Sequence, residues 1–369
     1  MYTTEDYITW RGDIPFAVSP LNEVDIYILS KAGAPDFSGI VPKTGEELPF
    51  SEVLAAYEEK YGRAGDKIGA LASPEIMPVL RRLPKTERFG ALRVSRFVNI
   101  IDGEETEQFS ALTLHLADGT AVVTFRGTDD HLLGWRENCY LASADEVAAQ
   151  RDALEYLEEA AGHTEGKLLL AGHSKGGNLA VFAAVKASEA LQERLDSVWC
   201  FDGPGFRIGF LDEPGYGRIL PKLHTVLPEH CMVGTLLYRK ERPEIVSCTK
   251  VAAMAHDGFC WETGPTGFVR AEGLHPVSEA YESAMRRTLI PMDARQRRDF
   301  TDSLFDILSR SGAETVTDLT AQGIARTAAM VGSLTLDTET RRFLSDFFEN
   351  FVGELRLRGI SIGRKSFLR

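Results

Sequence analysis

The sequence predicts an α/β protein built on a mostly parallel, doubly wound β-sheet with helices on both faces. Three observations predict this class. Short apolar segments typical of buried strands alternate with helical segments between residues 120 and 226. One of them, Leu168–Ala171, is wholly apolar, as expected of a central parallel strand covered on both sides. A glycine-rich turn, Gly172–Gly177, connects this strand directly to a helical segment.

Length, composition and charge limit the possible classes of protein. The chain has 369 residues, of which 44% are hydrophobic, enough for one large α/β domain with an appended part. Lysine and arginine total 41 and aspartate and glutamate total 54, so the net charge is −13. This charge would repel a phosphate backbone, and we do not expect nucleic acid as a partner.

The N-terminal residues and the cysteines indicate in which cellular compartment the protein is expected. Met1–Asp6 lacks the basic and apolar segments of a secretion signal, and no later run reaches the ~18 apolar residues of a membrane span. The five cysteines are widely spaced and form no Cys-x-x-Cys pair. They are Cys139, Cys200, Cys231, Cys248 and Cys260. We therefore expect a cytoplasmic protein with reduced, mostly buried thiols.

Elements before the glycine-rich turn are predicted from their apolar patterns. The stretch Val24–Leu29 predicts an early helix. Val94–Ile101 and Ser110–Leu116, separated by an acidic turn with glycine, predict a hairpin. The β-branched run Thr120–Phe125 predicts a buried strand, and residues 144–161 carry apolar positions among charges, which predicts an amphipathic helix.

The alternation continues after the turn. Asn178–Leu191 predicts a helix. Three further segments predict strands or strand-like structure: Ser197–Phe201, Leu223–Val226 and Glu244–Cys248. This order of elements is typical of β-α-β units in one sheet.

Beyond about residue 280 the strand signals disappear. Three helices are predicted there, over Asp293–Arg310, Thr317–Val331 and Thr338–Arg358. We therefore divide the chain into an α/β domain at residues 1–285, which includes the N-terminal segment, and a helical C-terminal extension at residues 286–369 that packs on it.

The segment Gly172–Gly176 carries the strongest chemical signal. Its pattern, Gly-x-Ser-x-Gly, is common, but here Ser174 lies between an apolar strand and a helix, the setting of a nucleophile elbow. Such a turn lifts the hydroxyl above the sheet and directs a helix N-terminus at a developing oxyanion. We expect Ser174 to be the nucleophile of an α/β-hydrolase fold. The alternative is a glycine-rich turn in which Ser174 only caps the helix.

A serine nucleophile needs a histidine base, which in this fold follows the order Ser, acid, His. His256 lies in a loop after the strand-like Glu244–Cys248 and fits this order best. The other seven histidines precede the serine, adjoin it, flank a strand or come where the sheet ends. The alternative for His256 is a packing role beside Trp261.

Two carboxylates are candidates for the acid that orients the base. Asp202 comes at the end of the next strand after Ser174, before a Gly-Pro-Gly turn. Glu229 comes near the end of a later strand. Asp202 has the clearer setting, although Asp before Gly is also common in plain turns. Asp257 adjoins His256, and neighbours in a loop seldom face each other well enough for this role.

The oxyanion hole needs a second donor besides the amide of Lys175, the residue after the nucleophile. The loop Arg126–Thr128 follows an earlier strand and supplies a candidate. Gly127 permits close approach of the backbone, and Thr128 offers both an amide and a hydroxyl. The alternative is a polar loop in which Arg126 forms an ion pair.

Several segments together resemble a known family. The chain is similar to bacterial, largely uncharacterised α/β-hydrolase-like proteins, grouped as a domain of unknown function and related to class 3, fungal-type lipases. The segments that carry the resemblance are Phe125–Thr128, Gly172–Ala180, Asp202–Phe206, Trp10–Asp13, Asn22–Asp25 and His256–Trp261. The resemblance spans most of the chain.

The resemblance implies Ser174 as nucleophile and Thr128 as an oxyanion donor, and it favours Asp202 over Glu229 as the acid. The chain departs from the lipase pattern at Lys175, where lipases usually carry an apolar residue. The segment between acid and base is also short compared with fungal lipases. Both departures count against a long-chain triglyceride as the substrate.

The predicted function is a serine hydrolase in which His256 takes the proton of Ser174 and Asp202 orients the imidazole. The amides of Lys175 and Thr128 hold the oxyanion, and no metal or organic cofactor is needed. We expect a small or medium acyl ester, or a lipid ester, as substrate. The Lys175 side chain either attracts an anionic substrate or points to solvent. The alternative is a catalytically inactive hydrolase fold that serves as a binding or scaffold protein.

The C-terminal helices raise two further expectations. They are candidates for a lid over the site. An apolar stripe along Leu344–Leu357, followed by the basic residues Arg364, Lys365 and Arg369, also suggests contact with a membrane surface. Such a stripe is more often a face of the core.

Overall fold

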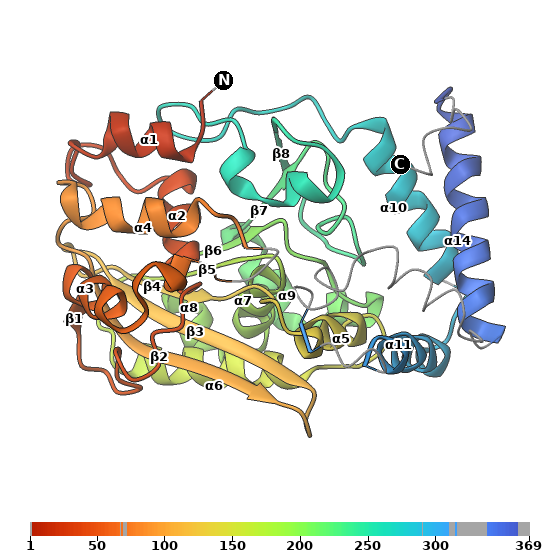
Figure 1. Cartoon of the computed structure of the whole chain (residues 1–369), viewed down its shortest axis with the longest axis horizontal. Coiled ribbons are helices and arrows are strands. Elements are labelled where there is room, and N and C mark those ends of the chain that lie inside the picture. Colours follow the sequence, from red (N-terminus) through yellow and green to blue (C-terminus); the bar gives the residue numbers. More distant parts are fainter. Residues whose placement is uncertain are drawn as a thin grey trace.

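The computed structural model describes residues 2–66, 68, 72–289, 291–309, 314–315 and 338–360. Within these ranges eight strands form one sheet, in which they lie side by side in chain order (Figure 1). The strands are β1 Leu48–Pro49, β2 Arg93–Asp102, β3 Glu107–His115, β4 Ala121–Phe125, β5 Leu168–His173, β6 Leu195–Phe201, β7 Leu223–Pro228 and β8 Glu244–Val246. The neighbours from β1 to β4 pair antiparallel, and those from β4 to β8 pair in parallel.

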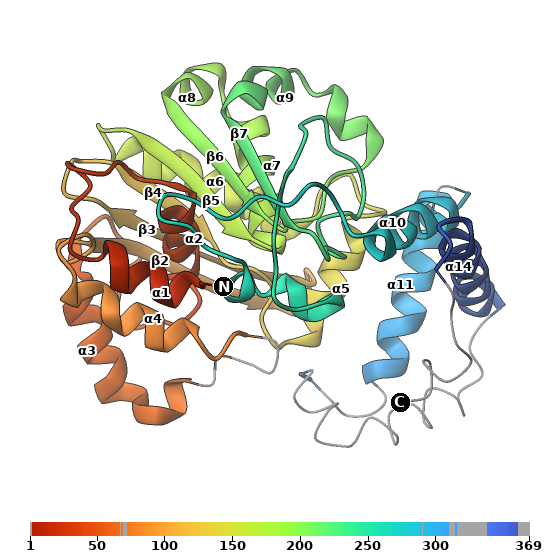
Figure 2. The same ribbon diagram turned by 90° about the horizontal axis from the view of Figure 1, so that it is seen from above.

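Helices cover both faces of this sheet (Figure 2). The α-helices of the described ranges are α1 Thr4–Arg11, α2 Glu23–Lys31, α3 Phe50–Tyr61, α4 Ile76–Arg82, α5 Leu132–Tyr140, α6 Ala148–Gly162, α7 Lys175–Lys186, α8 Glu189–Arg194, α9 Pro214–Ile219, α10 Pro276–Leu289, α11 Ala294–Ser309 and α14 Thr338–Leu357. The predicted α/β class, the early helix and the hairpin of β2 and β3 are confirmed.

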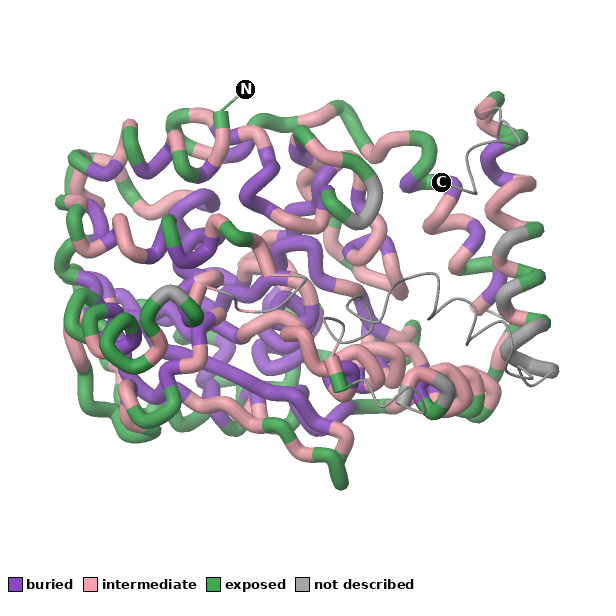
Figure 3. Tube along the Cα trace, viewed as in Figure 1, coloured by how far each residue is buried: buried purple, intermediate pink, exposed green. Residues whose placement is uncertain are grey.

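The sheet divides the apolar core into two clusters. Leu169 and Ala171 of β5 belong to the cluster that includes α2, whereas Leu168 and Leu170 belong to the cluster that includes α6 and α7. This alternation follows from the two-residue period of a strand. Buried residues gather at the centre of the molecule, along the strands (Figure 3). A strand covered on both faces must be apolar at every position, which explains the pattern of β5.

The helices that connect the parallel strands lie on one face. Because β4 to β8 follow one another in the sheet, right-handed crossovers bring α6, α7 and α9 to the same side. Residues of all three helices contribute to one apolar cluster. The opposite face is covered by α2 from the N-terminal segment, which packs on β4 and β5.

The prediction of one continuous helix over Asn178–Leu191 is wrong. The segment contains most of α7 and the start of α8. Ala187 between them has the extended angles φ −58° and ψ 154°, which end α7. The hydroxyl of Ser188 then accepts from the amide of Leu191 at 3.3 Å and caps α8.

The C-terminal helices α10, α11 and α14 lie together at one end of the molecule (Figures 1 and 2). α11 and α14 match the predicted helices Asp293–Arg310 and Thr338–Arg358 to within one residue at each end. The predicted helix Thr317–Val331 lies outside the described residues. α10 spans the predicted boundary at residue 285, and the division into two domains stays a prediction.

α14 uses part of its apolar stripe for packing. The ring centroids of Phe347 and Phe351 lie 5.9 and 6.5 Å from that of Tyr281 on α10, and Leu355 is buried. The basic residues after position 360 lie outside the described residues. Contact of this stripe with a membrane surface stays a prediction. No helix in the described ranges is both long and apolar enough to cross a bilayer.

A buried ion pair fixes the N-terminal segment. Asp25 of α2 pairs with Arg88, and both side chains are fully buried. Nε of Arg88 and the hydroxyl of Tyr7 each donate to Oδ1 of Asp25 at 2.8 Å. Nη1 of Arg88 also donates to the carbonyls of Ile14 and Ser19 at 2.9 Å. The Asn-Glu-Val-Asp stretch of the resemblance therefore ties α1 and α2 to the segment that leads into β2.

We predict that Asp25→Asn lowers the free energy of unfolding by about 3–5 kcal/mol, because the buried Arg88 would keep its charge and lose its carboxylate. Urea denaturation measures the change. Asp13→Asn is the matched control, since Asp13 is exposed in the same segment, and it should stay within about 0.5 kcal/mol of wild type. Equal stability of the two variants would contradict the role of the pair.

Candidate active site

The predicted site residues lie at one edge of the sheet. Thr128 follows β4, Ser174 follows β5, Asp202 follows β6, Glu229 follows β7, and His256 lies in the loop after β8. Because these strands are parallel, their carboxyl ends meet at the same edge. The topology thus brings together residues that are far apart in the chain.

Ser174 occupies a strained turn between β5 and α7. Its φ is 58° and its ψ is −130°, a region that residues with a side chain rarely adopt. The amide of Ser174 donates to the carbonyl of Phe201 on the neighbouring strand at 2.9 Å, which holds the turn. A Cβ on Gly172 would lie 2.1 Å from the carbonyl of Gly176, so only glycine fits there. These features are those of a nucleophile elbow.

Asp202 is a fully buried carboxylate in a second strained turn, with a φ of 46°. Its Oδ1 accepts from the amide of Gly234 at 3.0 Å and from the thiol of Cys231 at 2.8 Å. Its Oδ2 accepts from Nδ1 of His256 at 2.6 Å. A buried charge needs such partners, since unpaired burial would be costly. The two turns thus place a carboxylate and an imidazole in direct contact.

The bond to Asp202 fixes the tautomer of His256. A carboxylate only accepts, so Nδ1 of the imidazole carries the hydrogen. In the neutral ring Nε2 is then an acceptor, which is the form that a general base requires. The side chain of His256 is 24% exposed, so the ring reaches the surface at this edge of the sheet.

His173, the residue before Ser174, connects the elbow to the loop of His256. Its Nε2 donates to the carbonyl of His256 at 2.7 Å, and the two ring centroids are 4.4 Å apart. Burial lowers the pKa of His173 well below its usual range, and the charges of Lys31 and His256 lower it further. His173 is therefore neutral, with its hydrogen on Nε2. His173 adjoins the serine and so does not fit the order Ser, acid, His, and no sequence pattern indicates this bond.

Further contacts hold the loop of His256. Nε1 of Trp261 donates to the carbonyl of Ala255 at 2.8 Å. The carboxylate of Asp257 accepts from the hydroxyl of Ser73 at 3.0 Å and from the amide of Phe259 at 3.1 Å. Asp257 thus holds the loop in place, and its two carboxylate oxygens accept from Ser73 and Phe259.

Glu229 has hydrogen-bond partners other than the imidazole of His256. Its Oε1 accepts from the amide of Cys248 at 3.0 Å, and its carbonyl accepts from the amide of His275 at 2.7 Å. In the part of the chain that the structure describes, His256 contacts Asp202 and not Glu229.

The loop after β4 runs directly beside the serine. A Cβ on Gly127 would lie 3.3 Å from Cβ of Ser174 and 2.8 Å from the carbonyl of His173, so glycine is needed for the close approach. Nδ2 of Asn138 on α5 donates to the hydroxyl oxygen of Thr128 at 2.6 Å. Because this oxygen accepts from Asn138, its own hydrogen stays available for another acceptor. The sequence did not single out Asn138.

The side chain of Lys175 is fully buried, so both expectations for it, attraction of an anionic substrate and exposure to solvent, are wrong. Its Nζ pairs with the carboxylate of Glu137 on α5 and donates to the carbonyl of Gln108 at 2.6 Å. Glu137 also accepts from the amides of Gln108 at 3.0 Å and Ala149 at 2.9 Å. A buried ammonium needs such a partner, and it comes from a distant segment. The amide of Lys175 is separate, one of the first N–H groups of α7 without a partner inside the helix.

A second carboxyl group lies in the same buried region. Glu107 of β3 is 7% exposed. Burial raises its pKa to about 8, and the carboxylates of Asp152 and Glu137 add to this effect. Glu107 is therefore mostly protonated at neutral pH.

Lys31, at the end of α2, places a cation near this edge. Its Nζ lies 5.3 Å from the ring centroid of Tyr27, which packs edge-on against His173. Burial lowers the pKa of Lys31 to about 8, against the attraction of Asp257 and Asp202. No sequence pattern indicates this role, because lysines at helix ends are usually solvated.

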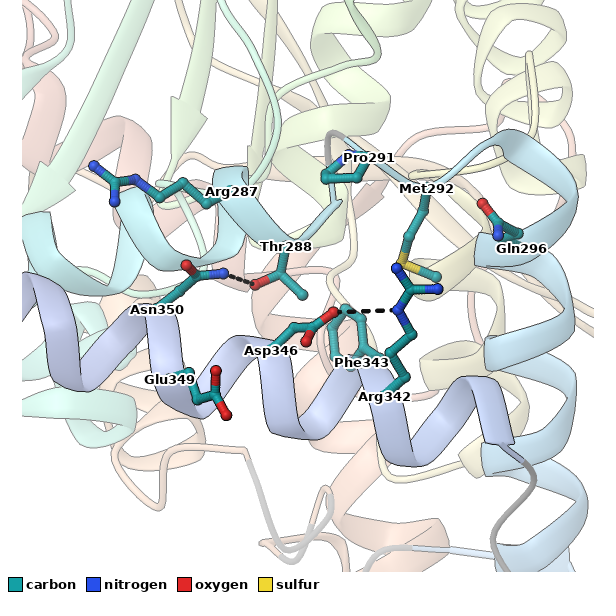
Figure 4. A pocket seen from close by; sticks show the side chains of 10 residues that line it. All are labelled: Arg287, Thr288, Pro291, Met292, Gln296, Arg342, Phe343, Asp346, Glu349 and Asn350. Carbon is teal, nitrogen blue, oxygen red and sulfur yellow. Dashed lines mark hydrogen bonds and ion pairs between the residues drawn. The ribbon is translucent and has the colours of Figure 1, made fainter.

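A separate cavity of about 310 Å³ lies among the C-terminal helices (Figure 4). Beside it, Asn350 of α14 donates to the hydroxyl of Thr288 on α10 at 3.2 Å. None of the predicted site residues lines this cavity, which belongs to the packing of α10, α11 and α14. In the described ranges, no group of three or more His, Cys, Asp or Glu side chains is arranged to hold a metal ion.

A mostly parallel sheet with a strained serine turn, followed by an aspartate and a histidine after later strands, defines an α/β-hydrolase fold. Residues 83–306 match the model of the Mbeg1-like family, and the chain belongs to this family. The assignment agrees with the resemblance to lipase-related, largely uncharacterised proteins that the sequence motifs suggest.

Two solved structures show similarity to the chain. M37 lipase is 14% identical with a TM-score of 0.36, over 57% of this chain and 68% of that chain. A mutant of MDLA from Penicillium cyclopium is 11% identical with a TM-score of 0.37, over 67% of this chain and 84% of that chain. No curated protein matches the chain.

We predict that Glu107→Gln weakens the pH dependence of stability. The native carboxyl has a pKa of about 8, whereas the unfolded chain restores its ordinary value of 4.5. Between these values unfolding releases a proton, so the free energy of unfolding falls as pH rises, and the loss is complete above about pH 8. Relative to wild type, the variant should therefore gain about 3–4 kcal/mol between about pH 5 and pH 8, since one proton contributes about 1.4 kcal/mol per pH unit.

Urea denaturation across this pH range measures the difference. Glu104→Gln is the matched control, because Glu104 is exposed in the turn of the same hairpin. Its curve should run parallel to that of wild type. A pH-independent difference between Glu107→Gln and wild type would show that the native carboxyl titrates normally.

Proposed function

We propose that the chain is a serine hydrolase that cleaves an acyl ester, with Ser174 as nucleophile, His256 as general base and Asp202 as the orienting acid. One observation supports this most strongly. The fully buried Asp202 accepts from Nδ1 of His256 at 2.6 Å, at the same sheet edge as the strained turn of Ser174. A buried carboxylate in this position keeps the imidazole in the tautomer that a base requires.

In the proposed acylation step, Nε2 of His256 takes the proton of Ser174 as the serine oxygen attacks the ester carbonyl. Asp202 stabilises the imidazolium that forms. The developing oxyanion accepts hydrogen bonds from the amide of Lys175 and from Thr128. His256 then gives its proton to the departing alcohol, and the acyl group stays on the serine.

In the proposed deacylation step, water replaces the alcohol. His256 takes a proton from the water as its oxygen attacks the acyl carbonyl, and the same donors hold the second oxyanion. The proton then returns to Ser174 and the acid product leaves. Every group in both steps belongs to the chain, the ester or water.

We propose a small or medium acyl ester as the substrate. The buried Lys175–Glu137 pair offers no free cation beside the nucleophile, so this lysine provides no preference for an anionic ester. A lid formed by the C-terminal helices and a lipid ester as substrate stay predictions.

A fluorophosphonate probe tests the proposal, because it reacts with an activated serine. We predict one covalent label per chain, located at Ser174 by peptide mass spectrometry, and hydrolysis of p-nitrophenyl esters of short acyl chains. Ser174→Ala should lose the label and at least about 10³-fold in turnover, with an unchanged unfolding temperature. Absence of labelling and of turnover in the folded protein would favour the inactive binding or scaffold protein.

The identity of the acid is tested by two isosteric substitutions. Asp202→Asn should lower kcat by about 10³–10⁴-fold, because an amide no longer holds His256 in the required tautomer. Glu229→Gln keeps an oxygen acceptor for the amide of Cys248 and should leave kcat within about twofold of wild type. The opposite ranking of the two variants would transfer the role to Glu229.

A further inference from the structure

Two thiols face each other in the loop that carries His256. The Sγ atoms of Cys248 and Cys260 are 2.9 Å apart, and both residues are buried. The amide of Thr249 donates to the carbonyl of Cys260 at 3.0 Å, and Cys248 pairs with Trp261 in an antiparallel bridge. A disulfide has an S–S distance of about 2.05 Å, so these sulfurs need to approach by less than about 1 Å.

The two cysteines bracket the candidate base in the chain. The carbonyl of Ala255, the residue before His256, lies 4.0 Å from the Sγ atoms of both Cys248 and Cys260. The same carbonyl accepts from Nε1 of Trp261 at 2.8 Å. A bond between the two sulfurs would therefore turn the loop of His256 into a covalently closed ring.

The surroundings favour a thiolate at Cys248. The sulfurs of Cys260 and Cys248 lie within hydrogen-bond distance of each other, and the amide of Lys250 donates to Sγ of Cys248 at 3.4 Å. These bonds, that with Cys260 foremost, lower the pKa of Cys248, whereas the same interaction and burial raise the pKa of Cys260. Cys248 is thus the attacking sulfur and Cys260 the resolving one.

The other three cysteines lack these features. All five cysteines are free and four are buried, in agreement with the prediction of mostly buried thiols. Burial raises the pKa of Cys139 to about 11 and that of Cys200 to about 12. Burial also raises the pKa of Cys231, whose thiol donates to Asp202. In the described structure, the close contact between two sulfurs is that of Cys248 with Cys260.

We propose that Cys248 and Cys260 form a redox-modification site, at which a peroxide converts the two thiols to a disulfide that closes the loop of His256. The thiolate of Cys248 attacks one oxygen of hydrogen peroxide, the O–O bond breaks, and a sulfenic acid and, after protonation, one water form. The sulfur of Cys260 then attacks that of Cys248, and the hydroxyl leaves with the proton of Cys260 as a second water. Two electrons pass from the thiols to the peroxide.

Closure leaves the candidate catalytic contacts in place. The sulfurs move by less than about 1 Å, and the bonds from His256 to Asp202 and His173 involve other atoms. The disulfide restricts the unfolded chain, so we expect the oxidised protein to unfold about 5 °C higher than the reduced protein. This site goes beyond the proposed hydrolase function, because its chemistry does not require ester cleavage.

Peroxide titration of the full chain tests the site. Free thiols are counted in denaturant, and peptides are analysed by mass spectrometry without reduction. We expect a fall from five thiols to three, with the peptides of Cys248 and Cys260 linked and about 2 Da lighter than their sum. Sulfinic or sulfonic acid at Cys248 without a link, a link to another cysteine, or five unchanged thiols would each overturn the proposal.

Cysteine substitutions test whether the disulfide between Cys248 and Cys260 causes these changes. Cys248→Ser and Cys260→Ser should each abolish the link and the rise in unfolding temperature. Cys139→Ser is the matched control and should retain both, because Cys139 has no part in the pair. If the esterase assays show no activity but the disulfide between Cys248 and Cys260 forms, the redox site is supported and only the proposed hydrolase function is contradicted. If peroxide raises the unfolding temperature of Cys248→Ser as much as that of wild type, the disulfide is not the cause.

Discussion

The structure of the site depends on the buried ion pair between Lys175 and Glu137. An unpaired ammonium in the core would be costly, so a lysine can follow Ser174 only where a carboxylate meets it. Glu137 reaches it from α5, and its carboxylate also accepts from the amides of Gln108 on β3 and Ala149 at the start of α6. One side chain therefore joins the elbow, the antiparallel part of the sheet and two helices.

α5, which carries Glu137, also contacts the loop after β4 and helix α11. Asn138, the residue after Glu137, donates to Thr128 in the loop beside the serine. On another side of the helix, Arg136 donates to Asp302 of α11 at 2.6 Å. The described contacts thus connect α11 to the loop of Thr128 through α5.

Local pattern made part of this architecture predictable from the sequence. A strand buried on both faces must be apolar, and a tight turn after it requires glycines. The apolar run of β5 and the glycines around Ser174 therefore predicted the strand and the turn. Asp202 was predictable because it ends the next strand. The buried side chain of Lys175, the bond of His173 and the role of Asn138 were not predictable. Each depends on a partner that only the tertiary structure brings near, such as the carbonyl of His256, 83 residues from His173.

The N-terminal helix α2 belongs to the site, although it precedes the family match at residues 83–306. The ring of Tyr27 lies 6.1 Å from that of His173 and 5.5 Å from that of Trp261, and a Cβ on Gly258 would lie 2.4 Å from this ring. The loop of His256 therefore packs on α2, on the face of the sheet that has no crossover helices. Since Asp25 and its buried partner anchor α2, the stability of the N-terminal segment and the position of the candidate base depend on the same contacts.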